Sequence, residues 1–288
     1  MHSPDAGGDG VALSYDDAGD GQPIVALHGL TATRRYVVMG SRALERSGHR
    51  VIAYDARGHG KSSPAPTADA YGYEALAADL ETLLDSLGID RALLAGASMG
   101  AQTALAFALT RPERVDALAL ITPAFDPDYT LAGERLERYD ALAAGLRDGG
   151  VEGFVEAYRQ SPAGVSAVDP RWRPAVLDAV RQRMALHEHP GAVADALRVV
   201  PRSRPFTAWE DLRALESIPA VVVASRDEAD PEHPLALGQR YAEALGGAAV
   251  RTEEIGSSPL AWQGGQLSRV IAELAARSQL DSEGPLVS

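Results

Sequence analysis

The stretch Gly96-Ala97-Ser98-Met99-Gly100 follows the apolar run Ala92–Ala95 and leads into the apolar, helix-favouring segment Ala101–Thr110. It is a G-x-S-x-G pattern between an expected strand and an expected helix. A serine in such a tight turn is strained. Side chains at the two flanking positions would collide with the neighbouring strand and helix, so both positions need glycine. The turn is expected to lift the Ser98 hydroxyl out of the sheet and to aim the first free N–H groups of the helix at a bound molecule.

Apolar runs of strand length recur on both sides of this turn and alternate with helix-length segments. The expected strands are Val11–Tyr15, Ile24–Leu27, Val51–Tyr54, Ala92–Ala95, Ala117–Ile121, Ala220–Val223 and Ala249–Thr252. The expected helices beside them include Tyr73–Leu87, Ala101–Thr110, Leu235–Leu245 and Leu267–Arg277. This alternation predicts an α/β fold in which helices cover both faces of a mostly parallel sheet.

The alternation of strands and helices stops in the middle of the chain, where residues 126–215 contain no convincing strand. This part reads as helices at Leu131–Leu146, Val151–Tyr158, Arg173–Leu186 and Val193–Val199, separated by glycine and proline breaks. A helical block between two sheet strands is an insertion. We therefore expect a core made of residues 1–123 and 216–288, and a helical cap at residues 124–215 over the sheet edge.

The composition is that of an ordinary globular enzyme and narrows the list of partners. The 288 residues are 45% hydrophobic and 23% charged, with a formal net charge of −13 and no cysteine. An acidic chain repels nucleic acid and anionic membrane surfaces, so a small-molecule substrate is the expected partner. The absence of cysteine excludes disulfides and thiolate metal sites. Residues 1–10 lack the apolar core of a signal peptide, and no apolar run approaches the roughly 20 residues that span a bilayer. We expect a cytoplasmic protein that has no cofactor and no metal site.

Together with the serine turn, the strand ending in His28-Gly29 and the segment Asp55–Ser62 resemble the α/β-hydrolase superfamily with a helical cap. The resemblance covers nearly the whole chain and implies that Ser98 is a nucleophile. It also implies that the backbone N–H groups of Leu30 and Met99 form an oxyanion hole, and that His28 and Gly29 lie at the substrate. The superfamily includes esterases, lactonases, C–C hydrolases, peroxidases and lyases, so the resemblance does not define the reaction. A serine nucleophile argues against dehalogenase and epoxide hydrolase chemistry, which needs a carboxylate.

The resemblance also implies positions for the remaining triad members. The acid aligns with Asp227 in the turn after Ala220–Val223, with Asp230 as the alternative. The histidine of the family aligns with Ser257 in the stretch Gly256–Leu260, and no histidine follows His233. Ser257 cannot act as a general base, so the sequence predicts an incomplete or rearranged triad.

Other histidines are candidates for the missing base. His28 and His59 are expected to brace loops, and His233 is expected to be a surface residue at a helix start. His187 and His189, in the expected cap, are the best alternative bases. A metal site from these two is disfavoured because residues two apart on a helix point away from each other. A relocated triad requires an imidazole nitrogen within about 3.2 Å of the Ser98 hydroxyl.

Two further features bear on the substrate. Trp262 lies close to the Ser257 stretch and is expected to line or block that end of the pocket. Arg198, Arg202 and Arg204 cluster at the end of the expected cap and could bind a carboxylate or phosphate, although a solvated basic face is the more ordinary interpretation.

Three hypotheses about function follow. The first is a hydrolase or acyl-transfer enzyme that attacks a small ester or carbonyl substrate with Ser98. The second is a lyase, cyclase or isomerase that uses the oxyanion hole to stabilise an enolate. The third is a ligand-binding protein that keeps the pocket without the chemistry.

Overall fold

The computed structural model describes residues 8–129, 133–161, 168–226, 233–253 and 262–283. In these ranges the chain forms one seven-stranded sheet in the order β1-β3-β2-β4-β5-β6-β7. The strands are β1 (Tyr15–Ala18), β2 (Gln22–Leu27), β3 (His49–Tyr54), β4 (Ala92–Ala97), β5 (Val115–Ile121), β6 (Ala220–Val223) and β7 (Ala249–Arg251). Only the edge strand β1 pairs antiparallel among them, and the other five pairings are parallel. The predicted α/β-hydrolase fold, with its mostly parallel sheet, is confirmed.

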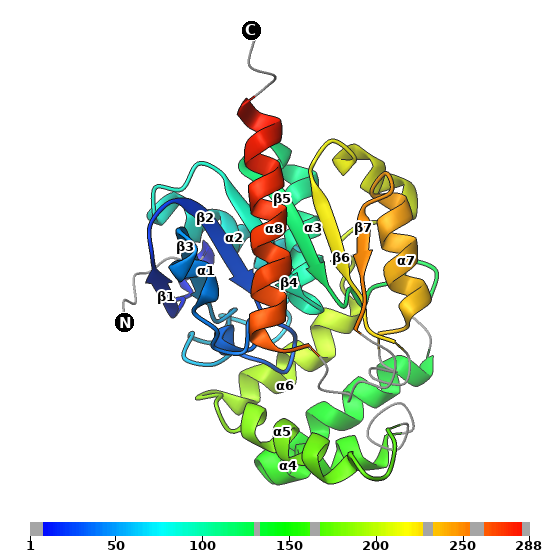
Figure 1. Ribbon diagram of the computed structural model, residues 1–288. Coiled ribbons are helices and arrows are strands. Elements are labelled where there is room, and N and C mark those ends of the chain that lie inside the picture. Colours follow the sequence, from blue (N-terminus) through cyan, green and yellow to red (C-terminus); the bar gives the residue numbers. More distant parts are fainter. Residues whose placement is uncertain (1–7, 130–132, 162–167, 227–232, 254–261, 284–288) are drawn as a thin grey trace, which may run out of the picture.

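Helices cover both faces of this sheet, as Figure 1 shows. The core helices are α1 (Ala43–Arg46), α2 (Tyr73–Ser86), α3 (Met99–Thr110), α7 (Leu235–Ala244) and α8 (Gly264–Glu283). Strand side chains alternate between two apolar clusters. Leu94 belongs to the cluster that includes residues of α2, α3 and α7, and Leu93 to the cluster that includes residues of α1 and α8. This alternation follows from the two-residue period of a strand, and it explains why the strands are apolar on both faces.

One predicted strand was displaced toward the C-terminus. Residues 11–14 are not in the sheet, and β1 begins at Tyr15. Val11 and Leu13 are buried in the core, but the N–H groups of Ala12 and Ser14 donate to the hydroxyls of Ser63 and Ser62. The segment therefore satisfies its backbone against a loop instead of a neighbouring strand.

Within the described ranges, three α-helices lie between β5 and β6 in the chain and gather beyond the carboxyl ends of the strands (Figure 1). We call them the helical segment: α4 (Gly133–Gln160), α5 (Arg173–Met184) and α6 (Pro190–Val199). They have an apolar cluster of their own, to which Leu146, Phe154, Val180 and Leu197 contribute. The two helices predicted on either side of Gly149-Gly150 form one element with a non-helical residue at Gly150.

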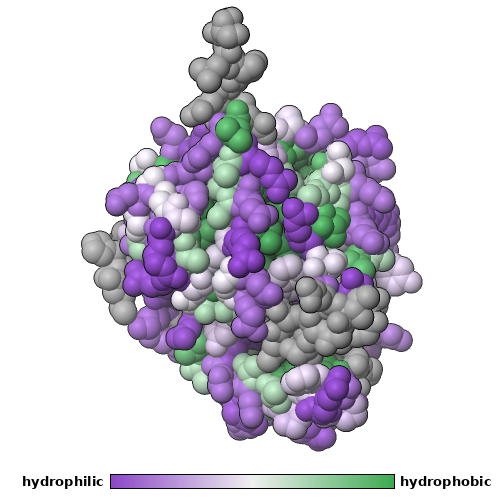
Figure 2. Space-filling model, viewed as in Figure 1, coloured by the Kyte–Doolittle hydropathy of each residue, from purple (hydrophilic) through white to green (hydrophobic). Residues whose placement is uncertain are grey.

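The face of the molecule in Figure 2 is mainly hydrophilic, with apolar side chains scattered over it. Among the described residues, no helix combines the length and the apolar character needed to cross a bilayer. The carboxyl ends of the strands face the helical segment (Figure 1).

Candidate active site

Ser98 occupies the turn between β4 and α3 in a strained backbone conformation, with φ 49° and ψ −109°. A β-carbon on Gly96 would overlap the backbone of Gly100, and one on Gly100 would overlap the carbonyl oxygen of Leu27 in β2. The predicted need for glycine on both sides of the serine is confirmed. The Ser98 N–H donates to Ile121 O at 2.9 Å, which ties the turn to the end of β5. The structure thus holds the serine at the carboxyl edge of the sheet in the shape of a nucleophile elbow.

An imidazole stands directly beside this serine. Nε2 of His233 lies 3.1 Å from Oγ of Ser98, within the distance that a relocated triad requires. His233 follows β6 in the chain and lies two residues before the start of α7 at Leu235, two strands from the elbow in the sheet order β4-β5-β6. The expectation that His233 is a surface residue at a helix start was wrong. Parallel strands end at the same edge of the sheet, so a residue that follows β6 in the chain can lie beside the serine.

Ser98 and His233 both line a cavity of about 330 Å³ between the sheet edge and the helical segment. Its walls combine residues of the loop after β2 with apolar and aromatic side chains of α4 and α5, among them Leu142, Phe154, Tyr158 and Val180. Trp262 also lines it. The size is at the lower end of the range of roughly 300–1,000 Å³ for small-molecule sites.

Ser98 also lines a second, smaller cavity of about 30 Å³. Leu30 and Met99, the two residues expected to form an oxyanion hole, both line it. Met99 is the first residue of α3, so its N–H has no acceptor within the helix. The N–H of Leu30 donates to no backbone acceptor in the described ranges. Gly29 approaches the elbow closely, because a β-carbon built on it would lie 3.6 Å from Cβ of Ser98.

His28 lies behind the loop that carries Leu30 and does not line either cavity at Ser98. Its Nδ1 donates to Gly29 O at 2.8 Å, and its Nε2 accepts the N–H of Ala56 at 2.9 Å. Burial, with a smaller contribution from His59, lowers the pKa of His28 to about 3, so the ring is neutral at physiological pH. The predicted contact of His28 with substrate is corrected to a bracing role, because both ring nitrogens are used by the backbone.

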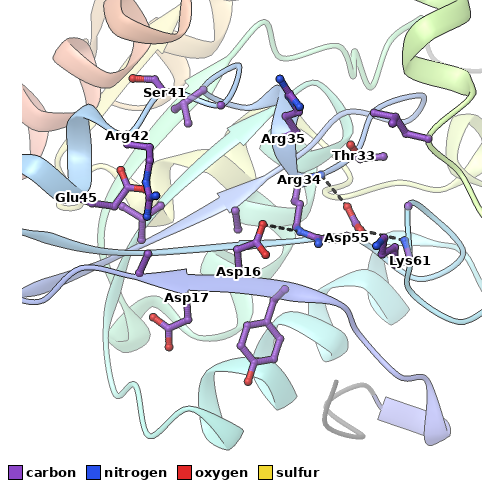
Figure 3. A pocket seen from close by; sticks show the side chains of 18 residues that line it. Asp16, Asp17, Thr33, Arg34, Arg35, Ser41, Arg42, Glu45, Asp55 and Lys61 are labelled. Atoms are coloured by element: carbon purple, nitrogen blue, oxygen red, sulfur yellow. Dashed lines mark hydrogen bonds and ion pairs between the residues drawn. The ribbon is translucent and has the colours of Figure 1, made fainter. Parts of the chain in front are cut away.

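The loop that carries Leu30 is also held at Arg34, by the buried carboxylate of Asp55. Asp55 Oδ1 accepts the N–H of Arg34 at 2.8 Å, and Oδ2 accepts the N–H of Lys61 at 3.0 Å. The Arg34 guanidinium pairs with the same carboxylate and with Asp16 (Figure 3). These groups line an open groove of about 900 Å³ that does not include Ser98 or His233. The groove is larger than either cavity that Ser98 lines.

His187 joins the helical segment to this loop region. Its Nδ1 accepts the N–H of Gly60 at 2.9 Å, Nε2 lies 3.4 Å from Thr31 O, and its ring stands edge-on to His59. Burial and the neighbouring His59 lower the pKa of His187 to about 3. His189 is the residue before α6 and lines neither cavity at Ser98. The expectation that His187 or His189 serves as the base is corrected, because the imidazole beside the serine is that of His233.

Three sequence-predicted triad positions, Asp227, Asp230 and Ser257, lie outside the described residues. The arginine cluster predicted near Pro201 lies on the surface. Arg202 pairs with Asp140 at 2.7 Å, and Arg204 donates to the carbonyls of Pro127 and Thr207. Within the described ranges, no three His, Asp or Glu side chains are grouped as metal ligands.

Comparison with known proteins identifies the family of the chain. Residues 22–155 match the family described as alpha/beta hydrolase fold. RutD of Caulobacter sp. (strain K31), named as a carbamate hydrolase, is 30% identical over 235 residues, which cover 81% of this chain and 82% of that protein. An sn-1-specific diacylglycerol lipase, ABHD11 of Danio rerio, is 33% identical over 126 residues, 43% of this chain but only 38% of the lipase.

A solved carboxylesterase structure from the Thaumarchaeon Nitrososphaera gargenis superimposes with a TM-score of 0.74 and 22% identity, covering 97% of this chain and 100% of that one. At that identity the likeness concerns the fold alone. The relative that is covered over most of its length is named as a hydrolase, which supports hydrolase activity here. The chain belongs to the α/β-hydrolase fold family.

Proposed function

We propose that this protein is a serine hydrolase of small esters, in which Ser98 is the nucleophile and His233 the general base. The distance of 3.1 Å between His233 Nε2 and Ser98 Oγ carries the proposal. A serine hydroxyl is a weak nucleophile until a neighbouring group accepts its proton, and imidazole can do so near neutral pH. The family relationship and the esterases among the structural neighbours support the same class of reaction.

The reaction proceeds in two halves. Oγ of Ser98 attacks the ester carbonyl carbon while its proton passes to Nε2 of His233. The negative charge that develops on the carbonyl oxygen is stabilised by the N–H groups of Leu30 and Met99, each donor being worth about 3–4 kcal/mol in such sites. The C–O bond to the alcohol breaks, and His233 returns the proton to the leaving oxygen. A water molecule, activated by His233, then attacks the acyl-enzyme, which releases the acid and restores Ser98.

The base in this mechanism comes from an unusual place in the chain. Ser257 aligns with the usual histidine, so His233 replaces it from the loop that follows β6. Asp227 or Asp230, a few residues earlier in that loop, is proposed as the carboxylate that orients the imidazole. The helical segment, within residues 124–215, is proposed as a cap that closes the cavity over Ser98, since α4 and α5 supply much of its wall.

The test compares p-nitrophenyl butanoate hydrolysis and fluorophosphonate labelling in four proteins: wild type, Ser98→Ala, His233→Gln and His189→Gln. We expect Ser98→Ala to abolish labelling and His233→Gln to lower kcat by about 10²–10⁴-fold, because a positioned general base contributes that much. His189→Gln is the matched control, since His189 lines neither cavity at Ser98, and it should retain wild-type kcat.

Two outcomes would replace the proposal. Turnover without labelling of Ser98 would favour the lyase, cyclase or isomerase hypothesis, because no acyl-enzyme would then form. Ligand-induced thermal stabilisation without any turnover would favour a binding protein.

A further inference from the structure

The two cavities at Ser98 have a cationic lining in an acidic protein. Arg138 and Arg183 line the larger cavity, and Arg135 lines the smaller one. Among the described residues, neither lining contains an aspartate or glutamate, although the chain carries 40 acidic against 27 basic residues. The charged side chains in the described lining of the two cavities are thus arginines.

Arg183 differs from the arginines on the outside of the helical segment. Arg147 pairs with Asp195, and Arg181 pairs with Glu152 at 2.6 Å and with Asp178 at 2.9 Å. Arg183, two residues after Arg181 on the same helix, is half-buried and forms no ion pair within the described ranges. Its Nε is buried without a hydrogen-bond acceptor there.

A second donor of the same kind lines the same cavity. The indole N–H of Trp262 is buried and also has no acceptor in the described part of the chain. A buried donor without a partner costs free energy, and a guanidinium costs more than a neutral group. Acceptor atoms supplied by a bound molecule would remove that cost.

We propose that the substrate is an ester that also carries a carboxylate, such as a dicarboxylic acid hemi-ester, and that Arg183 binds this carboxylate. The inference rests on the proposed ester hydrolysis at Ser98. The guanidinium fork matches a carboxylate with two parallel hydrogen bonds, and the apolar walls formed by Leu142, Phe154 and Val180 accommodate the hydrocarbon between the two ends of the substrate.

A carboxylate fits this lining better than a phosphate does. Phosphate sites typically use several backbone N–H groups at a helix N-terminus or in a glycine-rich loop. Arg183 instead projects from the last turn of α5, and apolar side chains surround the cavity. A monoanion with a hydrocarbon body therefore matches the site.

The experiment compares mono-p-nitrophenyl glutarate with p-nitrophenyl pentanoate, which has the same chain length without the charge. The measured quantity is the ratio of kcat/KM for the charged ester to kcat/KM for the neutral ester. We expect wild type to prefer the charged ester, and Arg183→Met to lower the ratio by about tenfold or more because the carboxylate loses its counter-charge. Arg183→Lys should keep part of the preference, and Arg181→Met, whose side chain pairs at the surface, should retain the wild-type ratio.

A binding measurement separates this inference from the proposed function. Monomethyl glutarate is titrated into Ser98→Ala and into Ser98→Ala/Arg183→Met by calorimetry. Binding that depends on Arg183 supports the carboxylate site even if neither ester is turned over, in which case the hydrolase proposal fails alone. Turnover of both esters with a ratio that Arg183→Met does not change overturns the carboxylate site and leaves the hydrolase proposal standing. Inhibition by inorganic phosphate but not by glutarate would also overturn it.

Discussion

Replacing His187 with glutamine should make the folded protein less sensitive to acid. His187 is only 8% exposed, and its Nδ1 accepts the N–H of Gly60, so the ring must stay neutral to keep this contact. Burial, together with the nearby His59, lowers its pKa from 6.5 to about 3. A glutamine carbonyl can accept the same N–H without titrating, so the variant keeps the contact and loses the linked proton.

The size of the effect follows from this pKa difference. Below pH 6.5 the unfolded chain binds a proton at His187, whereas the folded chain does not until the pH approaches about 3. The stability contributed by the neutral ring is therefore present above pH 6.5 and is lost as the pH falls toward about 3. Between about pH 7.5 and pH 5 the loss amounts to about 2 kcal/mol for this one group, to order of magnitude.

The assay is urea unfolding at several pH values in this interval. Wild type and His187→Gln are compared with Leu186→Gln, which changes an exposed neighbour that does not titrate. When the pH is lowered from about 7.5 to 5, the free energy of unfolding should fall for all three proteins. The fall should be about 2 kcal/mol smaller for His187→Gln than for wild type and Leu186→Gln. Equal pH dependence in all three would refute the neutral, buried state of His187.

Two further predictions concern the elbow and the buried charges. Gly100→Ala should lower the free energy of unfolding by about 1–3 kcal/mol, because the added β-carbon overlaps Leu27 O. Gly265→Ala is the control: a β-carbon there meets open space on α8, so this variant should not be destabilised. Thermal unfolding of both variants checks the prediction. Arg57→Met should cost about 3–5 kcal/mol, because it removes the counter-charge of the buried Asp79 carboxylate, and both side chains of this pair are 1% exposed. The double variant with Asp79→Leu should recover part of that loss, and chemical denaturation of the single and double variants would show whether it does.

Much of the architecture could be predicted because the relevant signals are local. Positions 96 and 100 must be glycine because a β-carbon at either would overlap backbone atoms at this one turn. The apolar runs predict strands because those strands are buried on both faces of the sheet. The displaced first strand shows the limit of this approach. Val11 and Leu13 have the apolar pattern of a strand. The N–H groups of Ala12 and Ser14, however, donate to serine hydroxyls that lie 51 and 48 residues further along the chain.

The position of the base could not be predicted in the same way. The approach of His233 to Ser98 joins residues 135 apart in the chain, so no local sequence pattern encodes it. The available signal was topological: every loop that follows a parallel strand opens at the same edge as the elbow, so a histidine in such a loop is a candidate base. Position in the chain also misled the prediction for His187. Its place between α5 and α6 suggested a catalytic role, but its ring nitrogens face the backbone of Gly60 and Thr31.

The central claim is that His233 accepts the proton of Ser98, and chemical rescue tests it most directly. The rate of p-nitrophenyl butanoate hydrolysis is measured with increasing imidazole in His233→Gly, and in His233→Gly/Ser98→Ala to subtract hydrolysis by imidazole itself. If imidazole replaces the lost side chain, the single variant starts about 10²–10⁴-fold below wild type, and its rate rises with imidazole above that of the double variant. A His233→Gly protein that keeps the wild-type rate, or an imidazole response equal in both variants, would contradict the claim.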